Sequence, residues 1–408
     1  MAGSEQEVLV ARLARYAADR YPVQHATTQF HLGSVLLQRG EPVPAERALS
    51  VARAMFADAG MSLEHAKATV MLGVALRTSG QLPEASAAFT EAGCVLGALG
   101  QPAEQAAAYY NLGLVRQDCA DLDGAHVAWV QACALFLEAG YPAQAAAAAR
   151  DHGASLLSAG QIADALPLLE QALSLADLAG HEPGVGAAAN ALGLAQLTAG
   201  QPAAAVGTLR RAVAAFPRTV RPADHAMAKA NLALAHERAG DAARARLAAG
   251  QALAVSSAAA PVRAQARALL ARQPAGTSQD VLVVLDSEPR DQWVAVVREE
   301  VLRALELAPD GRCAVLSALL DGVLARPDLA YDLAESLVHV VLELPPRPYA
   351  LVVTAVVEAC SGRPAPDTDR LSAVTASALA RFALPQWQRL VASLNAAAKD
   401  AGQPARWR

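Results

Sequence analysis

The sequence predicts an all-α fold, in which a solenoid of helical hairpins is followed by a separate helical domain. A pattern of small and large apolar residues recurs every 40 residues through six units, and glycines recur at half that spacing. The composition is 54% hydrophobic but only 4% aromatic, as expected for a core built from alanine and aliphatic side chains. Such internal repetition is typical of stacked helical hairpins, each of which buries its apolar face against its neighbours.

Four positions keep their register through the six units. Each unit has a small junction residue, an alanine twelve residues later, a large apolar residue four residues after that, and a second alanine three residues further on. The junction residues are Gly33, Gly73, Gly113, Gly153, Gly193 and Ala233, and the large residues are Leu49, Phe89, Trp129, Leu169 and Leu209, with Ala249 as the exception. The small residues let two helices approach closely, and we expect the large residue to fill the gap between neighbouring hairpins.

The glycines at half the period predict where helices end. They stand at 40, 80, 160, 200 and 240 after first helices, and at 60, 100, 140 and 180 after second helices. Glycine is favoured just past a helix because that position needs a positive φ. Proline soon follows several of them, as at Pro42, Pro102 and Pro202, where it suits the first turn of the next helix.

The order Leu-Gly, then Ala, then an aromatic residue or Leu, then Ala resembles the tetratricopeptide repeat over about residues 21–260. The usual unit of that family has 34 residues, whereas these units have 40, with Phe56, Leu96 and Phe136 continuing the second helix. The resemblance implies a solenoid whose concave groove binds another protein or a peptide. Longer helices of this kind occur in family members that bind extended peptides or act as regulatory sensors.

The domain prediction divides the chain at one point. Residues 1–275 form the solenoid, with capping helices at 5–19 and 262–272, and a short linker at 273–280 leads to a second domain, residues 276–408. The role of that C-terminal domain is unknown from the sequence.

The C-terminal domain shows no 40-residue period, and its prolines divide it into segments of helical length. Residues 291–307 and 385–398 each place their apolar side chains on one stripe, which predicts helices. The runs 281–285 and 338–342 are rich in valine and short, so β-strands are the alternative there.

Composition limits the cellular setting and the partners. No apolar run reaches 18 residues, and the N-terminus has neither a basic start nor an apolar core, so we expect a cytoplasmic protein with no secretory signal and no membrane partner. The five cysteines are scattered without a C-x-x-C pair, which favours reduced thiols. A net charge of −5 gives no reason to expect nucleic acid binding.

Charge is nevertheless distributed unevenly. Residues 118–182 hold nine acidic and one basic side chain, and residues 210–246 hold eight basic and three acidic ones. One interpretation is that both runs are solvated faces. The other is a bipolar solenoid that steers a partner or self-associates head to tail.

No catalytic motif stands out, so we predict no enzymatic activity, no cofactor and no metal. There is no P-loop, no H-E-x-x-H and no G-x-S-x-G. The G-x-G-x-x-A match at 184–189 falls at the start of a repeat's first helix and lacks the preceding strand that dinucleotide binding needs. His25, His65 and His225 occupy one repeat position, which predicts a shared structural task such as hydrogen bonding at the turn between repeats.

The family resemblance places the binding groove on first-helix residues next to the Leu-Gly pair. The chemically distinctive residues at those positions are Phe30, Tyr110, Asn111, Arg150, Asn190 and Asn231. Asparagine can hold a peptide backbone through its amide donor and its carbonyl acceptor, and arginine suits a carboxylate. The alternative is that Asn111 and Asn231 only satisfy neighbouring helix ends. The lysine and asparagine clamp used on chaperone C-termini is absent.

These observations favour a protein- or peptide-binding scaffold or adaptor that uses the concave groove. One alternative is a regulatory sensor whose groove takes a peptide or a small ligand and signals through the C-terminal domain. A second is an enzyme on an atypical scaffold, which would require Tyr110, Arg150, Asp151 and His152 to meet in a closed pocket.

Overall fold

The computed structural model describes residues 2–273, 280–404 and 406–407 of the 408-residue chain. Every regular element among these residues is a helix, which confirms the all-α prediction. The chain divides into two compact units, residues 1–199 and residues 200–408. Each unit is described here by itself.

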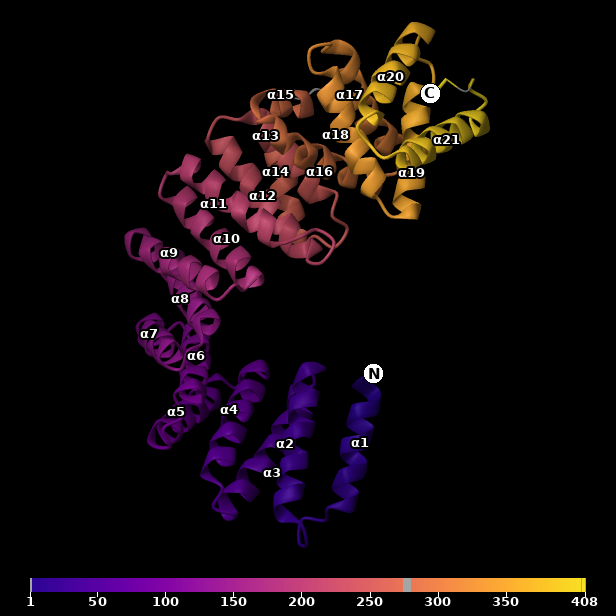
Figure 1. The fold of residues 1–408 in the computed structure, drawn as a ribbon. Coiled ribbons are helices and arrows are strands. Elements are labelled where there is room, and N and C mark those ends of the chain that lie inside the picture. Colours follow the sequence, from indigo (N-terminus) through magenta and orange to yellow (C-terminus); the bar gives the residue numbers. More distant parts are fainter. Residues whose placement is uncertain (1, 274–279, 405, 408) are drawn as a thin grey trace. The chain divides into compact units, whose positions relative to one another are not determined.

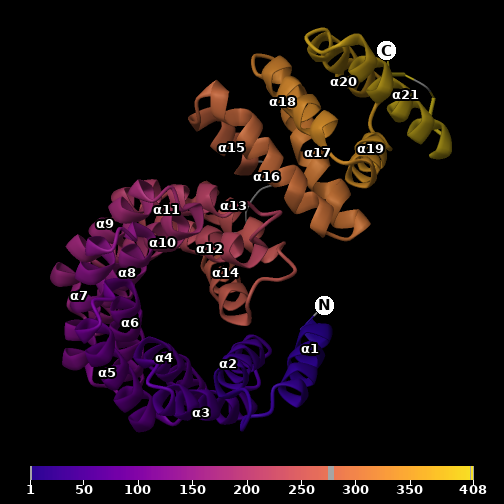
Figure 2. The same ribbon diagram turned by 60° about the horizontal axis from the view of Figure 1, so that its bottom comes forward.

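The first unit is a stack of helical hairpins of uniform length, shown in indigo to magenta in Figure 1. After α1, each helix has 17 residues and starts 20 residues after the previous one. The elements are α1 (Ala2–Arg15), α2 (Pro22–Gln38), α3 (Pro42–Asp58), α4 (Ser62–Thr78), α5 (Leu82–Ala98), α6 (Pro102–Asp118), α7 (Leu122–Glu138), α8 (Pro142–Ser158), α9 (Ile162–Leu178) and α10 (Glu182–Thr198). Within this unit, the first helices α4, α6 and α8 line the inner side of the curve, and α5, α7 and α9 lie outside (Figure 2).

The predicted turn glycines adopt the backbone conformation that the pattern requires. All nine have positive φ, between 59° and 82°. At the equivalent place after α6 the chain has Ala120, the only described non-glycine residue with positive φ, at 61°. The left-handed conformation strains any residue that carries a Cβ, so this turn keeps the geometry of its neighbours at a cost in stability.

The packing at the junction glycines explains the repeat. A β-carbon added at Gly113 of α6 would lie 2.5 Å from Nε1 of Trp129 on α7, and at Gly33 of α2 it would lie 2.5 Å from Cγ of Leu49 on α3. The large residue therefore fills the space left by the glycine of its own hairpin, and not a gap between neighbouring hairpins as expected from the sequence. Each glycine allows the two helices of a hairpin to pack around a fully buried side chain.

The recurrent histidines share a structural role, as predicted. The Nδ1 atom of each ring lies within hydrogen-bond distance of a backbone carbonyl near the end of the preceding helix. His25 contacts the carbonyl oxygen of Tyr16 at 2.7 Å, His65 that of Arg53 at 3.1 Å, and His225 that of Phe216 at 2.8 Å.

Two further histidines pack between hairpins of the first unit. The rings of His126 on α7 and His152 on α8 stack with their centroids 4.8 Å apart, and the His152 ring lies 6.3 Å from the indole of Trp129. Burial, together with the nearby His126, lowers the pKa of His152 from 6.5 to about 4. The imidazole is therefore neutral at physiological pH.

The second unit begins with the last repeats. It contains α11 (Pro202–Ala215), α12 (Pro222–Arg238), α13 (Ala242–Leu253) and α14 (Ala260–Arg272). The predicted C-terminal cap appears as α14, which packs on α12 and α13. At the other end of the repeats, in the first unit, the predicted cap at 5–19 appears as α1, which is already complete at Arg15 and packs on α2.

The rest of the second unit is also helical. The elements are α15 (Asp280–Ser287), the short 3₁₀ helix η1 (Arg290–Gln292), α16 (Trp293–Glu306), α17 (Pro309–Ala325), α18 (Ala330–Glu343), α19 (Pro346–Cys360), α20 (Ala365–Leu379) and α21 (Leu384–Asp400). Alternate helices pack side by side, so that α16, α18 and α20 form one layer and α17, α19 and α21 form the other. The core between them includes the fully buried Trp293, Leu316 and Val352.

The strand alternative for this region is wrong. Residues 281–285 lie in α15, and residues 338–342 lie in α18. In α18 the buried Leu333, Leu337 and Val341 follow one another at four-residue spacing, which is a helical stripe that extends beyond the valine run. Of the predicted linker, residues 274–279 lie outside the described residues. The predicted division at residue 275 falls within the second unit, and separate folding of its two sides stays a prediction.

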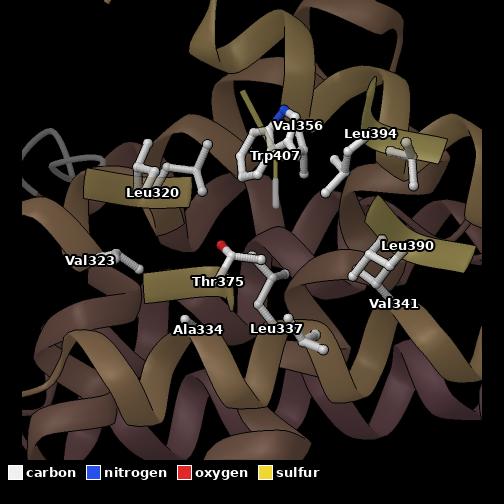
Figure 3. Close-up of a pocket in the computed structure, with 13 residues that line it drawn as sticks. Leu320, Val323, Ala334, Leu337, Val341, Val356, Thr375, Leu390, Leu394 and Trp407 are labelled. Atoms are coloured by element: carbon white, nitrogen blue, oxygen red, sulfur yellow. The ribbon is translucent and has the colours of Figure 1, made fainter. Parts of the chain in front are cut away.

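A small apolar cavity of about 40 Å³ lies inside the C-terminal helices (Figure 3). Its walls include Leu337 of α18, Thr375 of α20, Leu390 of α21 and Trp407. It is too small for an organic ligand, and a cavity lined by such side chains remains dry.

The junction packing gives a first testable prediction. Gly113→Ala places a methyl group against the fully buried Trp129, so we expect it to lower the free energy of unfolding by about 1–3 kcal/mol. The matched control is Gly207→Ala in α11, where an added β-carbon meets no atom within 4 Å, and which should be neutral or stabilise by up to about 1 kcal/mol. Urea denaturation measures both. Equal effects of the two substitutions would contradict the junction packing.

The strained turn after α6 gives a second prediction. Ala120→Gly removes the steric conflict of a β-carbon at positive φ, which outweighs the added flexibility of the unfolded chain. We expect it to raise the free energy of unfolding by roughly 0.5–1 kcal/mol. Ala159→Gly, at an ordinary right-handed position before a turn, should instead destabilise. A lower melting temperature for Ala120→Gly would show that the strain is absent.

The stacked histidines give a third prediction, on pH. The folded state holds His152 with a pKa of about 4, whereas the unfolded chain takes up this proton near pH 6.5. The contribution of neutral His152 to the free energy of unfolding is therefore fully present above pH 6.5 and is lost as the pH falls toward 4. Because the ring is only partly buried, we expect a loss on the order of 1 kcal/mol from this group. The stability difference between wild type and His152→Gln, measured by urea denaturation from pH 7.5 to 4, should shrink accordingly. Parallel pH profiles of the two proteins would exclude this role.

Candidate functional site

The predicted site residues of the first unit lie on successive first helices, along the inner side of the curve. Phe30 is on α2, Tyr110 and Asn111 are on α6, and Arg150 is on α8. All four are partly buried and partly exposed. Asn190 occupies the next equivalent position, on α10, and is buried.

The structure joins two of these residues, Tyr110 and Arg150, through their hydrogen bonds to Asp151. The hydroxyl of Tyr110 donates a hydrogen bond to Oδ2 of Asp151 at 2.7 Å, and Nε of Arg150 donates to Oδ1 of the same carboxylate at 2.8 Å. Burial and the negative charge of Asp151 both raise the pKa of Tyr110, so its hydroxyl remains a donor at neutral pH. The aromatic ring and the guanidinium are thereby fixed side by side across α6 and α8.

A second polar pair joins the preceding first helix, α4, to α6. Nε of Arg77 on α4 donates to Oδ2 of Asp118 on α6 at 2.7 Å, and both side chains are about one third exposed, at 34% and 38%. Arg77 and Asp118 are 41 residues apart, as are Tyr110 and Asp151. Sequence analysis missed the pair of Arg77 and Asp118. The signal for it in the sequence is two opposite charges 41 residues apart on adjacent first helices. We call Arg77, Tyr110, Asp118, Arg150 and Asp151 the inner polar cluster.

The surface beside the inner polar cluster is apolar. Val70, Met71 and Val74 of α4 and Leu114 of α6 are half-buried. On α2, Phe30 packs edge to face with the ring of His31 at 5.7 Å. The polar cluster is therefore flanked by aliphatic and aromatic side chains that retain some exposure.

The three predicted asparagines differ in availability. Asn111 donates from Nδ2 to the carbonyl oxygen of Ala107 in its own helix at 2.8 Å, which leaves the side-chain oxygen as an acceptor. Asn231 is buried, and its Oδ1 accepts from Nε2 of Gln265 on α14 at 3.0 Å. Asn190 and Asn231 therefore lie in the interior, where a partner reaches them only if the surrounding helices move.

The residues required for the enzymatic alternative do not all meet. Tyr110, Arg150 and Asp151 are joined by hydrogen bonds, but the ring of His152 instead stacks on His126. Within the described ranges, no group of three or more histidine, cysteine, aspartate or glutamate side chains is placed to hold a metal ion.

Part of the basic run at 210–246 forms ion pairs within the chain, and the two interpretations given to the run stay predictions. Its charges pair with acidic residues of α15, α16 and the segment between them. Arg246 pairs with Asp280 at 2.6 Å, Arg244 with Glu288 at 2.9 Å, and Lys229 with Glu299 at 3.3 Å. Part of the run is thus paired within the chain, and Arg211, Arg221 and Arg238 are exposed.

None of the helices in the described part of the chain is long and apolar enough to cross a membrane.

Comparisons with known proteins bear on the repeats. Two tetratricopeptide-repeat family models match residues 144–218 and 190–264. The comparison with curated proteins found no match.

Several solved structures are similar to the chain. BtubC from P. vanneervenii is 17% identical, with 62% of this chain and 95% of that chain covered and a TM-score of 0.45. The apo form of RapI is 11% identical, with 81% and 97% covered and a TM-score of 0.45. Aspartyl phosphate phosphatase F from Bacillus subtilis is 13% identical, with 88% and 92% covered and a TM-score of 0.44.

The matched residues keep the junction glycines Gly153 and Gly193 and turn glycines with positive φ, whereas α11 and α13 are shorter than the earlier helices, with 14 and 12 residues. Residues 144–264 are tetratricopeptide repeats.

Proposed function

We propose that the inner face of residues 1–199 binds an extended segment of another protein, and that the chain acts as a scaffold or adaptor. The observation that carries this proposal is the sharing of one carboxylate, Asp151, by Tyr110 and Arg150 on a partly exposed surface that apolar side chains flank. The tetratricopeptide repeats at 144–264 support it, because helical repeats of this kind commonly present extended binding surfaces.

The chemistry of the face indicates what it recognises. Arg150 uses Nε and one terminal nitrogen on Asp151 and is 29% exposed, so further guanidinium donors remain for a carboxylate or a carbonyl of the partner. The free Oδ1 of Asn111 suits a peptide N–H. Val70 and Val74 offer apolar contact beside them. The proposed partner is therefore a segment with an acidic side chain flanked by apolar ones.

We further propose that the chain works by binding and not by catalysis, with no cofactor, and that it acts in the cytoplasm on proteins and not on nucleic acids or membranes. The separation of the His152 ring from Tyr110, Arg150 and Asp151 supports this, because the four groups that the enzymatic alternative requires do not meet. A sensor that signals through its C-terminal helices is the second candidate. The observation that favours it is a ligand-sized cleft in residues 200–408.

The test is to identify the partner by co-purification and mass spectrometry, and then to measure its affinity for defined variants. Truncating Tyr110→Ala or Arg150→Ala should weaken binding by about 2 kcal/mol or more, because aromatic and arginine side chains that become buried dominate interface energetics. Tyr110→Phe keeps the ring but loses the bond to Asp151, and should have an intermediate effect. Isothermal titration calorimetry gives each affinity.

The control for this test is Arg47→Ala on α3, an exposed arginine on the outer helices. It should bind as the wild type does. Circular dichroism must first show that each variant keeps its helicity. Wild-type affinity in both Tyr110→Ala and Arg150→Ala would place the binding site away from the inner face.

A further inference from the structure

A cleft of about 360 Å³ lies within residues 200–408, a size typical of small-ligand sites. One wall comes from the last repeats, α11, α12 and α13. The other wall comes from α15, η1 and α16. The proposed partner-binding face lies elsewhere, in residues 1–199, so the cleft has no part in that function.

The cleft has two polar ends and an apolar middle. Lys229 and His236 line it from α12, seven residues or roughly 10 Å apart along that helix. Leu232 and Leu247 line the space from the repeats, and Val296 faces it from α16. A ligand that spans the cleft therefore needs an apolar body.

The hydrogen bonds at the Lys229 end are already satisfied within the protein. Nζ of Lys229 donates to Oε1 of Gln251 at 2.7 Å and lies 3.3 Å from Oε2 of Glu299. Nε2 of Gln251 donates to Oε1 of Glu300 at 2.8 Å, and Glu300 also pairs with Arg303. The polar side chains at this end therefore do not need a hydrogen-bond partner from a ligand.

The His236 end is different because Arg210 and His236 carry donors to which the described contacts give no acceptor. His236 is only 5% exposed, and among the described residues its imidazole makes no hydrogen bond. Burial lowers its pKa to about 4, so the neutral ring still carries one N–H donor at pH 7. Nη2 of Arg210 donates to Oε1 of Glu288 at 2.8 Å, and that same oxygen also accepts from Arg244 at 2.9 Å.

The donors without an acceptor are mainly those of Arg210. Arg210 has five N–H donors, of which the described contacts engage one, and its side chain is 47% exposed. A single oxygen of Glu288 meets both arginines, and Arg244 also pairs with Asp241, so the donors left without an acceptor belong to Arg210. The nearby His236 adds one more unsatisfied donor. An oxygen anion in the cleft can accept hydrogen bonds from the remaining donors of Arg210 and from the N–H of His236.

We propose that this cleft binds a small organic acid, with its carboxylate against Arg210 and His236 and its apolar body along Leu232, Leu247 and Val296. The bound acid touches both walls, so it links the last repeats to α15 and α16. This inference concerns a different surface from the proposed partner-binding face and does not depend on that face; the sensor candidate refers to the same cleft.

The experiment is isothermal titration calorimetry of the full chain with octanoate, and with octylamine and 1-octanol as matched ligands that lack the carboxylate. Octanoate should bind, and the two matched ligands should bind at least tenfold more weakly. Arg210→Gln removes the main carboxylate donor. Ala295→Trp fills the cleft from an exposed position of α16 without removing a charge. Each should weaken octanoate binding at least tenfold.

The control is Arg267→Gln on α14, an exposed arginine outside the cleft, which should bind octanoate as the wild type does. Circular dichroism establishes that each variant is folded. The proposal is overturned if the wild type does not bind octanoate, or if Ala295→Trp retains wild-type affinity, since the acid would then lie elsewhere. Equal affinity for octylamine and octanoate would also overturn it, because the cleft would not select a carboxylate.

Discussion

The close approach of two helices at a residue without a side chain sets the geometry of each hairpin. Gly113 leaves a space that the indole of Trp129 fills completely, and Gly33 and Leu49 repeat the arrangement. Such a contact fixes the separation of the helices and their relative register, since a packed interior tolerates neither a gap nor an added methyl group. Because consecutive helices are also of equal length, equivalent positions on successive first helices become neighbours. Residues 41 apart therefore meet on the inner face, as Tyr110 and Asp151 do.

The parts of the fold that the sequence predicts are those set by local and periodic signals. A glycine that must adopt positive φ, or a histidine that contacts a backbone carbonyl of the preceding helix, has the same role wherever it recurs. Ala120 shows the strength of the period, because it adopts the glycine conformation without being glycine. The sequence of the C-terminal helices has no repeat period. Taken alone, the valine-rich run in α18 therefore resembles a strand, although it belongs to a longer helical stripe.

The candidate site was less predictable, because it depends on which side chains pack between units. Position alone selects Asn111 and Asn231 equally, yet Asn231 is buried under α14, where Gln265 binds it. The same limit applies to charge. The basic run at 210–246 has the composition of a docking surface, but the acidic partners of Arg246, Arg244 and Arg210 lie 34, 44 and 78 residues further along the same chain. Segment charge cannot distinguish a surface that awaits a partner from one that is already covered.

The inner polar cluster and the network around Lys229 differ in burial, and therefore in how easily their side chains rearrange. In the inner polar cluster, Arg77 is 34% exposed and Arg150 is 29% exposed. A partner can therefore replace the water around these two side chains at little cost. Around Lys229, Gln251 and Glu300, by contrast, less than a tenth of each residue is exposed, and removing one partner of such a buried charge network typically costs about 3–5 kcal/mol. Undocking α16 from the last repeats would break that network. A signal passed through the second unit is therefore better carried by filling the cleft, which leaves the network intact, than by separating its walls.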